Sequence, residues 1–246
     1  MSLSRRNLLI FSLALLMITP ALAVSAQNDN GTNASQNQTT VLAKVNGAEI
    51  TQQQLSQSAQ VYPIIMTLSR QYRTFGQFLM SSESGQNFLN EYRKHVLDNL
   101  IDQTIQQQKI EELGIEVTEE EVQSEINTII ENNKQFKDEK ALEDYLKNNQ
   151  NMSLADFKSR MKEGLRSQKL RDEVTGNVSV SDEEVNSYYE KNKQSFTDQE
   201  GNVKPLEDVR SQIENTLVNQ KKSEAFSSWL EGARKEAEVE KFLDRM

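Results

Sequence analysis

The side chains that most often do chemistry in proteins are scarce in this chain. Its 246 residues include no cysteine and a single histidine, His95. Thiol nucleophiles, disulfides and metal sites built from cysteine or several histidines therefore lack their residues. A serine–histidine–acid triad could use only His95. This residue follows Lys94 at the predicted start of a helix, so we expect a partly exposed helical residue and not a general base.

Two runs of carboxylates are the remaining candidates, because glycosidases use paired acids. Glu119–Glu121 follows Thr118, and Asp182–Glu184 follows Ser181. A hydroxyl residue with glutamate three positions later forms a capping box, and acids in a first turn favour the helix dipole. Both runs therefore predict helix starts. With only 9 glycines and no glycine-rich phosphate loop, the sequence predicts no enzyme, no metal and no cofactor.

Composition narrows the class of protein further. Apolar residues make up 36% and charged residues 26%, while only 3 prolines and 9 glycines are available for turns, which favours a soluble, helix-rich fold. The formal net charge is −9. An acidic chain without a basic patch argues against nucleic acid and anionic membrane surfaces as partners, and leaves basic or unfolded polypeptides compatible.

The N-terminus has the pattern of an export signal. Arg5 and Arg6 precede the apolar run Leu8–Ile18, and the small-residue site Ala21–Ala23 follows. We predict a signal peptide over residues 1–26 and a disordered polar tether over residues 27–40. The alternative is an uncleaved anchor helix, which would be the only membrane contact.

The elements after the tether follow from local patterns. β-Branched alternation around Asn46-Gly47 predicts a hairpin, and Thr51 with Gln54 caps a helix that Pro63 interrupts or kinks. The central stretch, residues 95–129, predicts a helix that ends at Gly114 and a second helix that begins after Thr118. A long amphipathic helix after Pro205 and a weak strand signal near residues 239–242 close the chain.

Ile64–Met80 is the richest apolar and aromatic segment after the N-terminal run. Aromatic residues at helical spacing are usually core. The alternative is an adaptable apolar surface, for which Met and Phe are suited because their side chains re-pack on varied partners.

These segments resemble the N-terminal chaperone module of the SurA, PrsA and PpiD group of extracytoplasmic folding factors, which is similar in part to trigger factor. The segments that carry the resemblance are Leu42–Thr51, Val96–Asp102, Leu113–Val122, Asn151–Phe157, Val180–Val185, Tyr188–Asn192 and the helix from Pro205. The resemblance implies a mainly α fold in which the C-terminal helix packs back on the helical module. It also implies a strand at residues 237–242 that pairs with residues 41–44, so residues 41–196 and 205–246 would form one domain.

One departure from this family bears on activity. The resemblance implies a parvulin-type prolyl isomerase domain between the Tyr188-Tyr189 helix and the closing helix. Here only Ser195–Lys204 lies in that place, which is too short for a domain. We therefore expect a member without isomerase activity.

Two functions remain open. The first is an ATP-independent holdase, exported to the periplasm or the outer face of the cell membrane, that shelters unfolded or partially folded exported polypeptides in an apolar cradle. The second is an envelope adaptor or structural protein that docks one specific folded partner. The sequence leaves homodimerisation open. The candidate contacts for unfolded polypeptides are Tyr62, Met66, Tyr72, Phe75, Phe78 and Met80.

Overall fold

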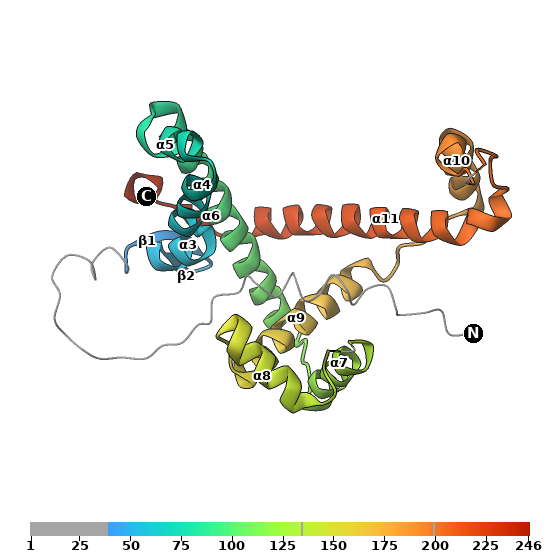
Figure 1. The fold of residues 1–246 in the computed structure, drawn as a ribbon, viewed down its shortest axis with the longest axis horizontal. Coiled ribbons are helices and arrows are strands. Elements are labelled where there is room, and N and C mark those ends of the chain that lie inside the picture. The colour runs from blue at the N-terminus through green and yellow to red at the C-terminus, as the bar shows by residue number, and fades with distance from the viewer. Residues whose placement is uncertain (1–38, 134, 199) are drawn as a thin grey trace. The chain divides into compact units, whose positions relative to one another are not determined.

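The computed structural model describes residues 39–133, 135–198 and 200–246 (Figure 1). The predicted signal peptide and most of the predicted tether lie outside these residues. The described residues are mainly helical with one small antiparallel sheet, which confirms the predicted fold class. The described part of the chain includes no helix that is both long and apolar enough to cross a membrane.

The bounds of the elements are as follows: β1 Val41–Val45, β2 Ala48–Thr51, α3 Gln52–Ala59, α4 Val61–Gln71, α5 Arg73–Ser81, α6 Glu83–Glu112, α7 Glu119–Asn132, α8 Glu139–Gln150, α9 Leu154–Thr175, α10 Asp182–Asn192, α11 Leu206–Glu236 and β3 Val239–Lys241, with short 3-10 turns at Lys193–Ser195 and Leu243–Arg245.

These elements belong to two compact units. One unit ends at Ser167 and also includes Glu236–Met246, and the other is Gln168–Lys235. The prediction that residues 41–196 and 205–246 form one domain stays a prediction.

The sheet of the first unit joins the two ends of the described chain. Its strand order is β2-β1-β3, and both pairings are antiparallel. Asn46 and Gly47 form the hairpin turn with φ angles of 49° and 85°, as a turn of the Asn-Gly type requires. Ala43 pairs with Lys241, so the predicted pairing of the first and last strands is confirmed.

Helix α6 is the longest helix of this unit in Figure 1 and runs for 30 residues, about 45 Å. Its buried side chains include the predicted apolar face: Val96, Leu97, Leu100, Ile101, Ile105 and Ile110. The helix ends at Gly114, which has a φ of 63°. Gly114 N–H bonds to Glu111 O and Ile115 N–H to Ile110 O, which is the Schellman arrangement that satisfies the last carbonyls.

Helices α7, α8 and α9 enclose a second core in this unit. Its buried side chains are Val117, Val122, Ile126, Phe136, Leu142, Leu146, Phe157 and Met161. At the edge of this core, Lys158 Nζ lies 2.9 Å from Glu139 Oε1, and Gln123 Nε2 donates to Glu139 Oε2 at 2.8 Å. The hydrogen bond from Lys158 and then that from Gln123 lower the pKa of Glu139, because both favour the carboxylate.

The second unit has a small core between α10 and the first half of α11. Val185, Tyr189, Phe196, Val209 and Ile213 are its buried residues. Tyr189 Oη donates to Lys204 O at 2.7 Å, so the hydroxyl of this buried tyrosine has a hydrogen-bond partner. The predicted capping boxes at Thr51, Thr118 and Ser181 are all present.

Candidate functional site

The corner formed by helices α3 to α6 includes a sharp junction where α3 ends and α4 begins. Helix α3 ends at Ala59, the next residue Gln60 takes the left-handed conformation, and Pro63 lies in the first turn of α4. Proline has no N–H, so it cannot donate to Ala59 O four residues before it. Tyr92 Oη from α6 donates to that oxygen at 3.1 Å instead. This contact fixes the joint between α3 and α4 against α6.

Two buried glycines let the helices of this corner approach closely. A Cβ at Gly76 would lie 2.0 Å from Ser69 Oγ, so α5 meets α4 at this point. A Cβ at Gly85 would lie 2.3 Å from Phe78 O and 2.6 Å from Leu79 Cα, so α6 meets α5 in the same way. Distances below 3 Å leave no room for a side chain. These two contacts fold α4, α5 and the start of α6 into one tight corner.

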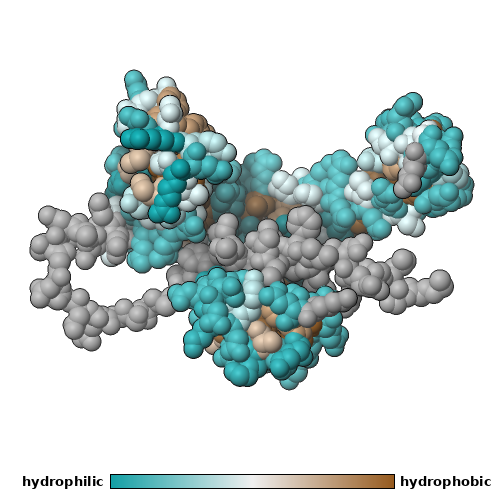
Figure 2. All heavy atoms as spheres, in the orientation of Figure 1, coloured by the Kyte–Doolittle hydropathy of each residue, from teal (hydrophilic) through white to brown (hydrophobic). Residues whose placement is uncertain are grey.

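Many large apolar side chains of this corner face solvent. We call them the aromatic face: Tyr62, Ile64, Tyr72, Phe75, Phe78, Met80 and Phe88. Phe75 and Phe78 stack with ring centroids 6.5 Å apart. Figure 2 shows apolar side chains at the surface of this part of the molecule, among polar ones. Exposed large apolar side chains that gather on one corner of a protein indicate a candidate interaction site.

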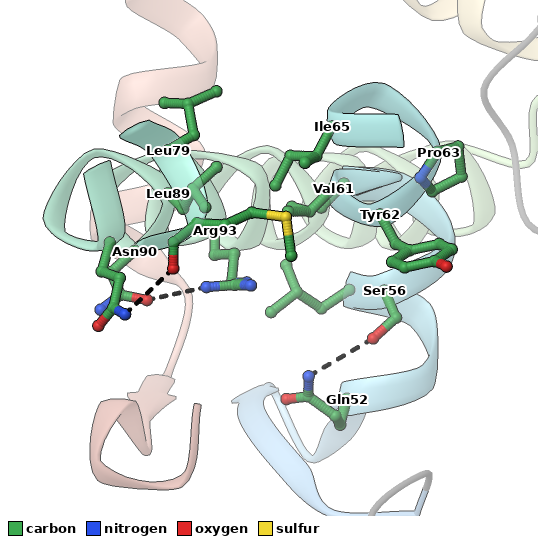
Figure 3. A pocket seen from close by; sticks show the side chains of 14 residues that line it. Gln52, Ser56, Val61, Tyr62, Pro63, Ile65, Leu79, Leu89, Asn90 and Arg93 are labelled. Carbon is green, nitrogen blue, oxygen red and sulfur yellow. Dashed lines mark hydrogen bonds between the residues drawn. The ribbon is translucent and has the colours of Figure 1, made fainter. Parts of the chain in front are cut away.

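Beside the aromatic face lies a pocket of about 530 Å³ (Figure 3). Its apolar lining consists of Leu55, Ala59, Val61, Tyr62, Pro63, Ile65, Leu79, Met80 and Leu89. The polar lining includes Gln52, Asn90 and Arg93 and contains no carboxylate. Arg93 Nη1 donates to Asn90 Oδ1 at 2.8 Å, and Gln52 Nε2 donates to Ser56 Oγ at 3.4 Å. Gln52 Oε1 is buried without a hydrogen-bond partner.

Five of the six predicted contact residues belong to the aromatic face, and two of these five also line the pocket. Tyr62 and Met80 line the pocket, and Tyr62 remains 69% exposed. Tyr72, Phe75 and Phe78 are exposed on the aromatic face but do not line the pocket, and Met66 is half-buried. Within the segment Ile64–Met80, only Ile65, Gly76 and Leu79 are buried. The segment therefore lies mostly at the surface.

Sequence reasoning missed two members of the aromatic face, Ile64 and Phe88. Phe88 is 61% exposed and lies near the start of α6. The buried face of α6 is formed by residues such as Val96 and Leu100, and Phe88 falls outside it. An apolar residue that interrupts the polar face of a predicted helix was the available signal.

The corner can bind apolar side chains and hydrogen-bond an amide, but it offers no acid–base pair. His95 is exposed in the middle of α6 and not at a helix start as predicted, because α6 begins at Glu83. Within the described ranges, no three His, Asp or Glu side chains are placed to hold a metal ion.

Comparison with known proteins decides the family. The SurA-like N-terminal domain model matches residues 1–171, well over half of the chain. The chain belongs to the SurA-like N-terminal domain family. The helices and the pocket of the α3–α6 corner all lie within the matched residues.

Curated relatives of this family member include foldase proteins PrsA from clostridia. The protein of Clostridium botulinum strain Hall is 32% identical over 163 residues, which are 64% of this chain and 46% of the relative. The protein of Clostridium kluyveri is 26% identical over 195 residues, 75% of this chain and 56% of the relative. This SurA-like chain thus spans about half the length of the curated relatives it matches.

A solved structure from Campylobacter jejuni shares the fold. It comes from work on two structurally related SurA-like chaperones, the virulence factor PEB4 and the periplasmic protein Cj1289. The TM-score is 0.60 at 15% identity, and the match covers 82% of this chain and 98% of the other. At this identity the likeness concerns the fold alone.

A second family model corrects the expectation about enzymatic activity. The PPIC-type PPIASE domain model matches residues 180–242, which form α10, the loop with the Thr197–Val203 bridge, α11 and β3. This finding contradicts the prediction that the chain is not an enzyme, and in part the prediction that it lacks the isomerase domain. The prediction about the domain rested on the short segment Ser195–Lys204, and the family match instead runs through α10 and α11 on either side of it. The prediction that the chain is not an enzyme rested on the scarcity of catalytic residue types.

Proposed function

We propose that this SurA-like protein is an extracytoplasmic chaperone that holds unfolded exported polypeptides through the aromatic face and the adjoining pocket. The observation that carries the proposal is the exposure of large apolar side chains on a corner whose backbone is fixed by Gly76, Gly85 and the Tyr92 hydrogen bond. The relatives named foldase PrsA and the fold neighbour described as a SurA-like chaperone support a role in protein folding.

The chemistry of the surface suits exchangeable binding. The exposed rings and the Met80 thioether offer apolar contact without shape-specific polar groups, so many sequences can be accommodated. A disordered polypeptide loses conformational entropy when it is captured, which keeps its affinity low for a given contact area. No nucleotide is needed for such a cycle, and we propose that holding is independent of ATP.

The first test is suppression of aggregation. An unfolded exported protein is diluted into buffer with and without this protein, and light scattering is followed without ATP. We expect suppression at near-stoichiometric amounts. Absence of suppression across several clients would contradict the chaperone proposal and favour an adaptor that docks one folded partner.

A double substitution links suppression to the surface. Phe75→Ser with Phe78→Ser removes the stacked pair, and we expect weaker client binding with unchanged helicity because both rings are exposed. Leu113→Ser is the matched control, since Leu113 is also exposed but lies at the other end of α6. Loss of helicity in the double variant would show that the rings support the fold, and equal loss of binding in Leu113→Ser would remove the case for this surface.

We also propose prolyl isomerisation as a second activity, on the ground of the PPIC-type match over residues 180–242. Uncatalysed isomerisation takes tens to hundreds of seconds, so catalysis is readily measured with a proline-containing peptide in a protease-coupled assay. We expect the protein to accelerate isomerisation, and the Phe75→Ser, Phe78→Ser variant to keep that rate because both residues lie outside the match. An unchanged uncatalysed rate would overturn this second proposal alone.

A further inference from the structure

The part of the chain that carries the aromatic face differs in charge from the rest of the protein. The whole chain has 37 acidic and 28 basic residues and a formal net charge of −9. From Ile50 to Ser82, a stretch that contains every member of the aromatic face except Phe88, there is no Asp or Glu, and the charged residues are Arg70 and Arg73. Glu83 follows as the first residue of α6. This stretch contains α3, α4 and α5 and is therefore locally positive on an acidic protein.

Both arginines are neighbours of exposed aromatic residues in the chain. Arg70 is in the last turn of α4 and Arg73 is the first residue of α5, on either side of the exposed Tyr72. The close approach of Gly76 to Ser69 makes this junction one tight turn, and Phe75 comes two residues after Arg73. Both arginine side chains belong to exposed residues. A segment bound at Tyr72 therefore lies close to the backbone positions of both arginines.

These two arginines differ from other basic residues of the unit in their ion pairing. In the part of the chain that the structure describes, neither Arg70 nor Arg73 forms an ion pair. Basic residues elsewhere on the same unit commonly do, as in Lys94–Glu91 at 2.7 Å and Lys109–Glu112 at 2.8 Å. The charge of the two arginines is thus available to a ligand.

The adjoining pocket also has positive and no negative charge in its lining, and it contains a hydrogen-bond acceptor without a partner. Arg93 is its only charged lining residue. Gln52 Oε1 is buried without a partner, and a backbone N–H of a bound polypeptide could satisfy it. An occupant with apolar side chains, backbone donors and negative charge matches all of these features.

We propose that the aromatic face selects polypeptide segments in which aromatic or aliphatic side chains are flanked by Asp or Glu. The inference rests on the proposed chaperone function and names its preferred clients. Apolar contact supplies the affinity, and Arg70 and Arg73 supply the preference, because they attract neighbouring carboxylates and repel lysine or arginine. A second copy of this chain fits poorly as the occupant, because two such faces would place arginine against arginine.

The test compares three peptides that share one apolar core rich in Phe and Leu and differ only in flanks of Asp, Ser or Lys. Fluorescence anisotropy measures their binding to the full-length chain. Because exposed ion pairs are weak individually, we expect the Asp-flanked peptide to bind about three- to tenfold more tightly than the Lys-flanked one. The difference should shrink at about 1 M salt, where the Debye length falls to about 3 Å.

Paired variants then locate the preference. Arg70→Gln with Arg73→Gln should abolish the difference between Asp and Lys flanks and leave the Ser-flanked peptide unaffected. Lys140→Gln with Lys147→Gln in α8 changes the net charge equally at exposed positions, and it should keep the preference. Equal loss in this control would show a general charge effect and overturn the role of the two arginines.

The outcomes separate the two proposals. If all three peptides bind equally, or the Lys-flanked peptide binds best, the charge preference is wrong and the chaperone function stands. If none of the three peptides binds and the protein also fails to suppress aggregation, the proposed chaperone function itself fails. Sedimentation of the chain alone measures self-association. If the chain dimerises and the Arg70→Gln, Arg73→Gln variant dimerises more strongly, the face would instead be assigned to a second copy.

Discussion

At the scale of single residues, Ala59 O shows how one polar group is satisfied from outside its own helix. Pro63 removes the donor that a continuing helix would supply, and the left-handed Gln60 has already ended α3. Ala59 is 2% exposed, so water does not easily replace that donor. The Tyr92 hydroxyl on α6 does so at 3.1 Å. The contact joins the junction of α3 and α4 to α6, the longest helix of its unit.

We expect Tyr92→Phe to lower the free energy of unfolding by about 1 kcal/mol, because it leaves a buried carbonyl without a hydrogen-bond donor. Urea unfolding followed by circular dichroism measures the change. Tyr62→Phe is the control, since Tyr62 is largely exposed and its hydroxyl should contribute little. Equal stability of Tyr92→Phe and the original chain would show that the carbonyl finds another partner.

At the scale of elements, glycine decides how closely α4, α5 and α6 cross. Gly76 and Gly85 are both buried in helices, where glycine is otherwise unfavourable compared with alanine. Their positions are explained by contact with a neighbouring helix, since a Cβ at either one would overlap atoms of that helix. The exposure of Phe75 and Phe78 follows, because a tight corner leaves no gap for these rings to enter.

Two glycine substitutions in the same unit should have opposite effects. Gly85→Ala should lower the free energy of unfolding by about 1–3 kcal/mol, because the new methyl group would overlap the backbone of Phe78 and Leu79. Gly164→Ala in α9 has nothing within 4 Å and should raise it by about 0.5–1 kcal/mol through helix propensity. Thermal and urea unfolding measure both. A stabilised Gly85→Ala would contradict the close crossing of α5 and α6.

At the scale of the whole molecule, the first and last described strands lie side by side in one sheet. β1 pairs with β3, and Asn46 reinforces the closure, because its backbone N–H donates to Glu238 O and its Oδ1 accepts from Glu238 N–H, both at 2.8 Å. Asn46 Nδ2 also donates to Gln108 Oε1 at 2.7 Å on α6. One turn residue thus connects the hairpin, the closing strand and α6.

Asn46 should therefore respond differently to two substitutions. Asn46→Gly removes the side-chain bonds but suits the φ of 49°, and should lower the free energy of unfolding by about 1 kcal/mol. Asn46→Ala loses the same bonds and adds left-handed strain, which costs about 1 kcal/mol more. Urea unfolding gives both values, and amide hydrogen exchange in β1 reports the closure directly. Equal stability of the two variants would argue against the left-handed turn.

The sequence by itself determined the local elements of this protein and their ends. The hairpin at Asn46-Gly47, the capping boxes at Thr51, Thr118 and Ser181, and the end of α6 at Gly114 were all predictable. Each depends on backbone hydrogen bonds and conformational preferences that act over a few residues. Pairing of the first and last strands was also foreseen, from the resemblance and from two strand signals.

Only the tertiary structure decided whether the segment Ile64–Met80 is core or surface. Periodicity shows which side chains share a helix face, but burial depends on which other helix covers that face. Here Gly76 and Gly85 set the covering contacts, so Ile65 and Leu79 point inward and Phe75 and Phe78 remain outside. The Tyr92–Ala59 bond is likewise invisible in sequence, since it joins residues 33 positions apart. Long-range contacts of this kind carry the candidate site, and local patterns do not encode them.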